Sequence, residues 1–369
     1  MADNSIFRQL GVDGALQTFL DSRLDKFNQP WYKNYFSFSA PQLSLSYTAV
    51  LGESVITTAA SVVSRDAETP LRARQAIAKL SGEIPAIKVM RKLNESHVRD
   101  YMALQELSNI SDKAKADQVW KLIWDDSKYV AESVDKRIDV MCAQALSTGK
   151  INIDSDTNPD GIVLPAIDLL HPNENKTNAS VDWATSASAK PIEDISAVVD
   201  KAAGTGLMFE KIIMDAKAYA LFAKSAQVKD SVSAFFGITK SASSSATAPI
   251  TLDRINEYMM ASRLPVIEVV NIKVAIEKNG VSSVMNPWKE ANVAFVPAGN
   301  LGEIKNAVAV EETRPVEKVV YAKKENTLIS KWSNNEPFGE WTKAELNAFP
   351  ALTAINQIHL LSTDKGFTL

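Results

Sequence analysis

The apolar residues between positions 116 and 146 recur at three- and four-residue spacing, which is typical of one apolar face of a helix. They are Val119, Ile123, Val130, Val134, Ile138, Met141 and Ala145. Gly149 follows the run and suits a helix C-terminal cap. About thirty helical residues would extend about 45 Å, whereas the mean helix has about 11–12 residues. The pattern predicts one long helix, which is either a core helix or a structural spine.

Two short β-prone runs follow this helix, at 150–153 and 161–167, and the acidic segment between them has two interpretations. Oxygen-bearing side chains alternate there as at the start of a calcium loop: Asp154, Asp156, Asn158 and Asp160. An EF-hand loop counted from Asp154 would need glycine sixth and glutamate twelfth, but Pro159 and Pro165 stand there. Asp, Asn, Pro and Gly are also the residues that turns select. We therefore predict a hairpin over 149–168 with a turn at its tip, in preference to a calcium site.

Short helical and strand patterns alternate from Pro191 onward. Pro191 lies in the first turn of a predicted helix that Gly204 ends. The sequence "KIIMD" predicts a short buried strand, and its last residue, Asp215, can cap a helix over 216–236. Strand and helix therefore follow each other closely here.

The next part of the chain continues this alternation. Small residues over 240–250 predict a flexible loop, and "LDRINEYMMASRL" predicts a helix. The sequences "PVIEVVNIKVAI" and "VSSVM", joined by an Asn279–Gly280 turn, predict a hairpin, and "NVAFVPAGN" predicts a further strand. Together these elements predict a compact α+β unit over 191–315.

The two ends of the chain are less self-sufficient than this unit. Residues 1–40 form an aromatic-rich arm that is too small to bury its own rings, so it must dock on another part of the protein or on another copy. Its rings are Phe7, Phe19, Phe27, Trp31, Tyr32, Tyr35, Phe36 and Phe38. Residues 41–92 show neither a clean period nor a dense apolar core, which favours an extended excursion. At the other end, "VEKVVYAKK" and "TAINQIHLLS" predict strands that return to pair beside the 149–168 hairpin.

The composition is that of a globular protein, with 369 residues, 46% hydrophobic and 23% charged, and suggests two or three structural units. A formal net charge of −4 gives no global attraction to nucleic acid. The single cysteine, Cys142, excludes an intramolecular disulfide and fits a reducing compartment. Without a signal-peptide core or a run of eighteen apolar residues, we expect a soluble protein made in the cytoplasm.

The chain offers few candidates for catalysis. His97, His171 and His359 lie far apart, and none has a cysteine or carboxylate at ligand spacing. The segment "STGKIN" lacks the earlier glycine of a phosphate loop, and no G-x-S-x-G, H-E-x-x-H or G-x-G-x-x-G occurs. We therefore predict no catalytic, cofactor-binding or metal-binding residues, and a protein that is not an enzyme.

Several motifs, in a fixed order, resemble one protein family. The segment "DAKAYALFAKSAQVKDSV" carries an Asp, Lys, aromatic, Ala-Leu-Phe pattern, and Trp183 with "KPIEDI" precedes it. "ALSTGKI" lies upstream, and "LPVIEVVN", "NVAFVPAGNLGEI" and "WSNNEPFGEWTKAELNAFPALTAINQIHLL" lie downstream. From about residue 93 to the end, this order is similar to that of the phage lambda major capsid protein family.

The resemblance implies the α+β, HK97-like major capsid fold of tailed bacteriophages. Its expected parts are an N-terminal arm over 1–40, an extended loop over 41–92, a spine helix and peripheral β domain over 93–190, a central axial domain over 191–315, and a return to the peripheral domain over 316–369.

The implied function is that of a virion structural protein. Such a major capsid protein self-assembles into hexamers and pentamers of an icosahedral shell around double-stranded phage DNA, without sequence-specific binding. Portal and scaffolding or decoration proteins are expected partners, and assembly is expected in the host bacterial cytoplasm, without cofactor or membrane. The alternatives are another virion structural protein, associated with the tail or portal, and a small-ligand-binding α+β protein.

The charge pattern suggests how copies could meet. Between Arg65 and Lys92 lie seven basic and three acidic residues, a net +4, whereas 94–148 carries ten acidic and seven basic residues, a net −3. The resemblance places the extended loop along a neighbouring spine, so we expect a positive loop on a negative spine to guide register. Ordinary solvated faces are the alternative. The arm begins almost at once, so we also expect the assembled subunit to keep its own N-terminus.

Overall fold

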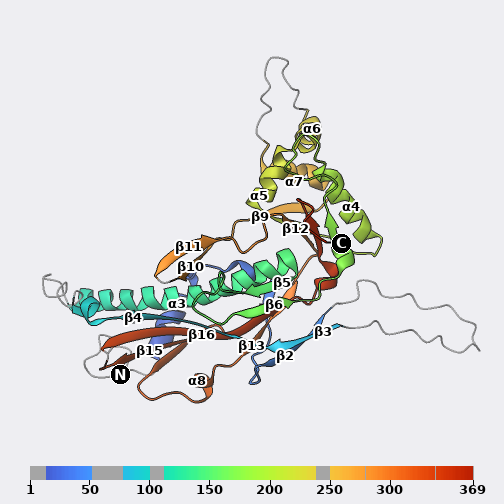
Figure 1. Ribbon diagram of the computed structural model, residues 1–369. Helices are drawn as coiled ribbons and strands as arrows, with labels where there is room; N and C mark the ends of the chain where they lie inside the picture. Colours follow the sequence, from blue (N-terminus) through green and yellow to red (C-terminus); the bar gives the residue numbers. More distant parts are fainter. Residues whose placement is uncertain are drawn as a thin grey trace, which may run out of the picture. The chain divides into compact units, whose positions relative to one another are not determined.

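The computed structural model describes residues 14–51, 78–99, 112–237, 250–278, 280–336 and 338–368 (Figure 1). The chain divides into two compact units, each built from three separate stretches. Unit 1 comprises Met1–Tyr47, Gly82–Asp139 and Ile304–Pro350. Unit 2 comprises Thr48–Ser81, Val140–Glu303 and Ala351–Leu369. Helices and sheets occur in both, so the α+β class is confirmed.

Unit 1 is built on a six-stranded sheet. Its order is β1 (Phe36–Phe38), β13 (Gly302–Ala307), β16 (Gly339–Ala351), β15 (Thr327–Asn334) and β14 (Val320–Lys324), and β4 (Ala86–Leu93) also pairs with β16. The short helix α8 (Val310–Thr313) lies in the connection between β13 and β14. Residues 340–345 of β16 pair with β15 on one side and with β4 on the other.

The long helix is confirmed as α3 (Asp112–Thr148), slightly longer at both ends than predicted. In unit 1 its inward residues Ile123, Val130 and Val134 are fully buried. The helix ends in unit 2 at Gly149, which has φ 72°, a conformation that favours glycine. A Cβ atom on Gly149 would lie only 2.6 Å from Cβ of His171, so close packing also requires glycine there.

Residues 41–92 are only partly the extended excursion that we predicted. β2 (Ser46–Leu51) and β3 (Ala78–Glu83) form a two-stranded sheet, and residues 52–77 lie outside the described part. β4, however, is a strand of the unit 1 sheet. Its eight-residue register runs from Leu93↔Glu340 to Ala86↔Asn347. The alternation of half-buried Ile87 and Val89 with exposed Lys88 and Met90 is the strand signal that the prediction missed.

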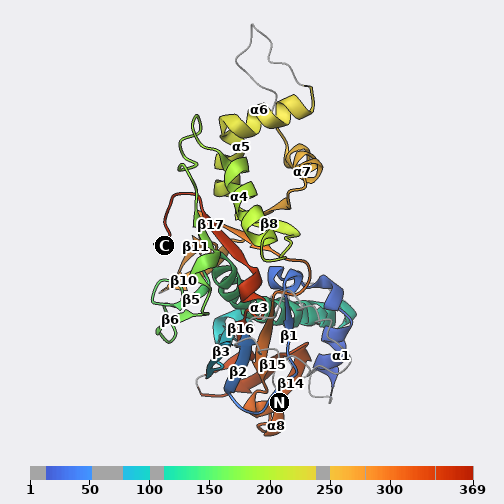
Figure 2. The ribbon, with the colours of Figure 1, turned by 90° about the vertical axis from the view of Figure 1, so that its right-hand side faces the viewer.

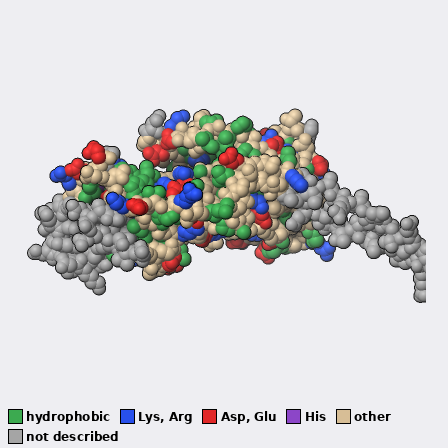
Figure 3. Space-filling model, turned by 90° about the horizontal axis from the view of Figure 1, so that it is seen from below, with side chains coloured by type: hydrophobic (Ala, Val, Ile, Leu, Met, Phe, Trp, Pro, Cys, Tyr) green, Lys and Arg blue, Asp and Glu red, His purple; other side chains and the backbone are tan. Residues whose placement is uncertain are grey.

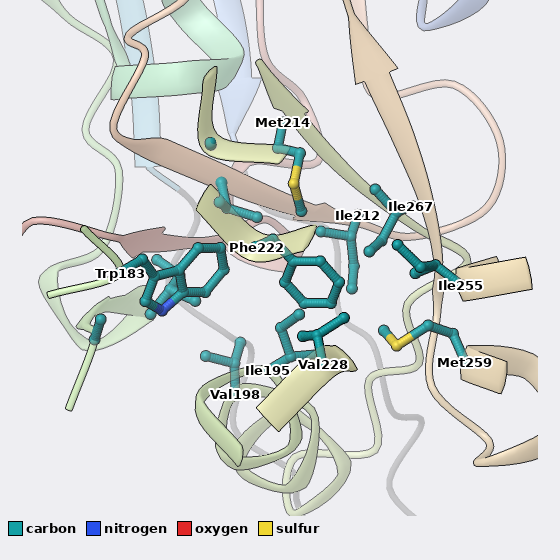
Figure 4. Close-up of a cluster of buried hydrophobic side chains, with 14 of the residues drawn as sticks. Trp183, Ile195, Val198, Ile212, Met214, Phe222, Val228, Ile255, Met259 and Ile267 are labelled. Carbon is teal, nitrogen blue, oxygen red and sulfur yellow. The ribbon is translucent and has the colours of Figure 1, made fainter. Parts of the chain in front are cut away.

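Unit 2 contains a five-stranded sheet with helices gathered on it (Figure 2). The strand order is β7 (Lys176–Asn178), β17 (His359–Ser362), β12 (Asn292–Val296), β8 (Lys211–Asp215) and β9 (Val266–Val270). The helices are α4 (Pro191–Ala203), α5 (Ala216–Lys224), α6 (Ala226–Phe235) and α7 (Leu252–Ala261). Trp183, Phe222 and Met259 are among the side chains that fill the core between sheet and helices (Figure 4).

Most predicted elements of this region are confirmed, but the single helix over 216–236 was wrong. Asp215 caps α5 as predicted, its carboxylate accepting from the Lys217 amide. The chain then breaks at Ser225, which has ψ 145°, and α6 begins. The Ser225 hydroxyl accepts from the amide of Val228, so serine ends one helix and caps the next.

The predicted hairpins both form in unit 2. β5 (Lys150–Ile153) pairs with β6 (Leu164–Asp168), and β10 (Val274–Lys278) pairs with β11 (Val281–Met285). In the second hairpin, "PVIEVV" does not take part; it forms β9 and pairs in parallel with β8. Asn279 of the predicted turn lies outside the described residues, as does most of the 240–250 loop.

The prediction that the C-terminal strands pair beside the 149–168 hairpin was wrong. β14 from "VEKVVYAKK" pairs with β15 in unit 1. β17 lies in unit 2 between β12 and β7. All four residues of β17 are buried, and such a strand gains most from a central place in a sheet with helices on it.

Candidate functional site: the arm docked on the spine helix

Among the described residues, no group of three or more His, Cys, Asp or Glu could hold a metal ion. Nor does the described part of the chain contain a helix with the length and hydropathy needed to span a bilayer. Lys150 of "STGKIN" pairs with Asp168 at 3.3 Å across the β5–β6 hairpin.

The three histidines are not brought together as a site. His97 is exposed in unit 1, whereas His171 and His359 are buried in unit 2. Burial lowers the pKa of His171 to about 4, with Lys176 as a further cause. Burial likewise lowers the pKa of His359 to about 4, helped by Lys201. Both rings are therefore neutral near pH 7 and serve as packed core residues.

The acidic segment that resembled a calcium loop acts as a turn. One carboxylate oxygen of Asp154 accepts from the amides of Asp156 and Thr157, at 3.0 and 2.8 Å. The Asn158 amide donates to the Asp154 carbonyl at 2.7 Å. The bonds to the carboxylate, that from the Thr157 amide above all, lower the pKa of Asp154. The carboxylate thus organises the hairpin tip through main-chain bonds.

The arm docks on α3 of its own chain through aromatic rings, all within unit 1. Phe19 of helix α1 (Ala15–Asp21) stacks on Trp120, with ring centroids 4.4 Å apart. Phe27 meets Trp124 edge-on at 4.9 Å, after the short 3-10 helix η2 (Leu24–Lys26). The sequence left open whether these rings dock on the same copy or another, and for these two the answer is the same copy. Phe7 lies outside the described residues.

Acidic side chains on α3 then hold the arm by its main chain. Asp139 is fully buried, and its carboxylate accepts from the amide of Tyr32 at 3.0 Å. Tyr32, in the 3-10 helix η3 (Trp31–Asn34), also donates its hydroxyl to Asp135 at 3.2 Å. Glu132 accepts from the amide of Asn28 at 3.0 Å. Residues 132, 135 and 139 share one helix face, and we call them the arm-binding acids.

Asp135 and Asp139 are buried, so their carboxylates need bonding partners. The pKa of Asp139 is raised, chiefly by burial and against the lowering effect of the Tyr32 amide and Lys136. Lys136 reaches Asp139 at 3.1 Å, and Lys324 of β14 reaches Asp135 at 2.5 Å. The pKa of Tyr32 is raised by burial and by Asp135. A buried carboxylate needs such partners, so arm, helix and sheet fix one another.

Sequence reasoning counted the arm-binding acids only as part of a negative spine. The available signal was their spacing of three and then four residues, which places all three on one helix face. A further acid of α3, Asp126, lies on a different face of the helix, because nine residues separate it from Asp135, and the charge hypothesis assigned it to a neighbouring copy. In the structure it pairs with Arg91 of β4 at 3.2 Å within unit 1, and Arg91 also lies 3.9 Å over the Tyr129 ring.

Two further loop charges are used within the chain as well. Lys88 pairs with Glu345 at 2.9 Å, and Lys92 lies 5.0 Å from the ring centroid of Trp341. Lys331 on β15 is fully buried beside this network and donates to the Thr342 hydroxyl at 2.6 Å. Burial lowers the pKa of Lys331 to about 7, although Asp126 and Glu340 oppose the shift. Arg65, Arg72 and Arg74 lie outside the described residues.

The last turn of α3 is anchored in unit 2. Asn292 of β12 donates its side-chain amide to the Ser147 carbonyl at 2.7 Å, and the Lys289 amide donates to the Ser147 hydroxyl at 3.2 Å. Thus the helix makes polar bonds with each unit. These bonds hold the arm and the helix in fixed positions, which suits a protein that binds or assembles with other proteins.

Comparison with known proteins gives one family and one fold. The family model described as phage major capsid protein E matches residues 25–359. A phage-related protein from Bordetella bronchiseptica RB50 shares the fold with a TM-score of 0.53 at 12% identity, over 95% of this chain and 98% of that chain. The putative capsid protein of a prophage of E. coli CFT073 gives 0.55 at 13% identity, over 94% and 98%. A comparison with curated proteins gave no match.

Proposed function

The chain belongs to the phage major capsid protein E family and is a shell-forming capsid protein, and we propose that it assembles into hexamers and pentamers of an icosahedral shell around double-stranded DNA. The observation that carries this proposal is the extent of the family match, which spans residues 25–359 and therefore both units. An assembly of identical subunits with closed symmetry is the usual way in which one chain encloses a volume.

The domain roles follow from this proposal. Residues 1–40 are the N-terminal arm, and residues 41–92 are the extended loop, apart from β4, which belongs to the unit 1 sheet. Residues 93–190 supply the spine helix and peripheral domain. The compact unit over 191–315 is the axial domain, and 316–369 returns to the peripheral domain up to β16. β17 is better assigned to the axial domain, because it pairs with β12.

We also propose that the subunit performs no catalysis and encloses DNA by confinement alone. The absence of catalysis is supported by His171 and His359, which are buried and neutral. Enclosure of DNA without tight binding is supported by the net charge of −4, and acidic and basic side chains are interspersed on the face shown in Figure 3. A shell that must release its genome gains from weak contacts with phosphate. Portal and scaffolding or decoration proteins are the proposed partners, and the host bacterial cytoplasm is the proposed place of assembly.

Electron microscopy of the purified chain tests the proposal. Closed shells or capsomer-sized rings are the expected result. Tubes or a single ring size would favour a tail or portal-associated structural protein instead. A monomer that stays monomeric at assembly concentrations, with a small molecule bound in unit 2, would favour the ligand-binding alternative and overturn the capsid proposal.

A further inference from the structure

Each of the two larger sheets has one edge strand that a carboxamide side chain closes. In unit 2, Asn256 of α7 donates to the Ile267 carbonyl at 3.0 Å and accepts from the Ile267 amide at 2.8 Å, on the edge strand β9. In unit 1, Gln17 of α1 does the same for Lys323 on the edge strand β14, at 2.9 and 2.7 Å. Each carboxamide takes the place that a further strand would occupy, which prevents unwanted pairing.

The β5–β6 hairpin is protected in a different way. β6 carries Pro165, which cannot donate a main-chain hydrogen bond. The register between β5 and β6 shifts between Ile151 and Ile153, a bulge-like irregularity that disrupts a flat edge. The charged pair Lys150–Asp168 adds a further obstacle to pairing.

In the β10–β11 hairpin, strand β11 has none of these devices. Its two strands pair in an unbroken register from Val274↔Met285 to Lys278↔Val281. β11 reads "VSSVM", without charge, proline or glycine, and its first four residues are exposed. Val281 is 71% exposed and Val284 69%. Among the described residues, no hydrogen bond reaches a main-chain group of β11 from outside the hairpin.

The register shows which groups form this open edge. Lys278 and Val281 flank a two-residue connection, so they exchange main-chain hydrogen bonds across the hairpin. Bonded and non-bonded pairs alternate in antiparallel strands. The main-chain groups of Ser282 and Val284 therefore point away from β10. On the opposite edge, Ala275, the cross-strand partner of Val284, points away from β11 in the same way.

We propose that an extended segment of a second copy of this chain pairs with the outer edge of β11, adding a third strand to the hairpin in the assembled shell. The inference rests on the proposed function, since a shell supplies second copies at high local concentration. An exposed, uncharged edge strand is an aggregation site unless it is covered, and this chain closes the comparable edges at β9 and β14. Main-chain pairing would give affinity, and burial of Val284 would add to it.

Hydrogen exchange on the purified wild-type chain tests the proposal directly. We expect the amides of Ser282 and Val284 to exchange about tenfold or more slowly in shells than in unassembled subunits. The outward amides of β10, at Ala275 and Glu277, should change much less. Shells in which the β11 amides exchange as fast as in free subunits would overturn this inference and leave the capsid function intact. If the wild-type chain forms no shells, the proposed function fails and takes this inference with it.

A matched pair of proline variants gives the second readout. Val284→Pro removes an outward donor and leaves the bonds to β10 in place. Ala275→Pro makes the same change on the same rung at the other edge. We expect Val284→Pro to lower the yield of shells by about tenfold or more, and Ala275→Pro to assemble almost as the wild type, both with the circular dichroism of the wild-type subunit. Equal assembly by the two variants would contradict the proposal, and misfolding of either leaves the exchange measurement to decide.

Discussion

At the scale of single residues, a buried carboxylate holds the arm on the helix. Asp139 is fully buried and accepts from the amide of Tyr32, which is itself only 1% exposed. Without the carboxylate, that amide would be left without its partner in an apolar setting. Loss of a charged acceptor from a buried donor costs more than loss of a surface pair.

Asp139→Ala should lower the free energy of unfolding by about 2–3 kcal/mol. Asp139→Asn keeps an acceptor for the Tyr32 amide and should cost less. The matched control is Asp125→Ala, an exposed acid on the same helix, which should stay within about 0.5 kcal/mol of the wild type. Urea unfolding of unassembled subunits measures all three. An effect of Asp139→Ala as small as that of Asp125→Ala would show that the arm does not depend on this bond.

The buried histidines make the fold acid-sensitive. The pKa values of His171 and His359 are lowered from 6.5 to about 4 in the folded chain. Between those values the unfolded chain binds more protons, so stability is complete above about pH 6.5 and falls as the pH drops toward 4. At pH 5 each histidine should cost about 2 kcal/mol relative to pH 7.5.

Substitution separates this effect from general acid denaturation. His359→Gln should reduce the difference in urea midpoint between pH 7.5 and pH 5, whereas His97→Gln, at an exposed position, should leave it unchanged. A pH difference that is identical in all three proteins would show that the buried rings do not cause it.

Asp154 should act through turn geometry and need no ion. Chelator should leave the melting temperature of the subunit unchanged. Asp154→Ala should cost about 1 kcal/mol, because the amides of Asp156 and Thr157 lose their acceptor, while Asp160→Ala should cost little. A fall of several degrees in chelator, reversed by calcium and abolished by Asp154→Ala, would show instead that the loop binds metal.

At the scale of elements, the two carboxamides that close sheet edges differ in burial and should differ in energy. The Asn256 bonds are part-buried and satisfy Ile267, which is 2% exposed, whereas the Gln17 bonds to Lys323 are exposed. Asn256→Ala should therefore cost about 2 kcal/mol and Gln17→Ala about 0.5–1 kcal/mol. Chemical denaturation measures both. An equal loss of stability in the two variants would mean that burial does not determine how much each carboxamide contributes.

The same scale explains the break between α5 and α6. Helical periodicity continues through Ser225, so the sequence pattern favours one helix. Ser225 instead uses its hydroxyl twice, donating to the Phe222 carbonyl and accepting from the Val228 amide. Side-chain bonds of this kind compete with the helix at its ends. The bend lets Phe222 and Val228, on different helices, enter one core.

At the scale of the whole molecule, the hypothesis that loop and spine charges guide assembly applies only to charges that are not already paired within the chain. Arg91 and Asp126 pair in unit 1, so neither is free to guide a neighbour. Among the acids of the spine whose side chains the structure describes, Asp125 is exposed and remains suitable. Arg72 and Arg74, outside the described residues, remain the proposed loop side of the contact.

Arg72→Glu combined with Arg74→Glu should slow or misdirect assembly and leave the monomer folded, since charge guides register more than affinity. Asp125→Lys should restore part of the rate if these faces meet. Light scattering at low and physiological salt measures both, and the defect should shrink as salt screens it. Assembly of the loop double mutant at the wild-type rate in physiological salt would refute the contact. Asp126→Lys is unsuitable for rescue, because it would leave Arg91 without its partner.

What the sequence by itself determined are the features that depend on a few neighbouring residues. Apolar spacing defined α3, and Gly149 marked its end, because both follow from the period of a helix and from the freedom of glycine at positive φ. Turn chemistry gave the β5–β6 and β10–β11 hairpins, and Asp215 gave a helix start. The family resemblance also came from local motifs kept in order, and the match over 25–359 confirms it.

Only the tertiary structure decided which distant segments meet. β17 lies between β7 and β12, and β4 pairs with β16, because strand partners are chosen by burial and shape complementarity across hundreds of residues. The arm-binding acids and the Arg91–Asp126 pair belong to the same class, since a charge on a helix face has no partner until the fold supplies one. Local patterns fix the elements, and packing fixes their neighbours, which is why the candidate site could not be found from the sequence.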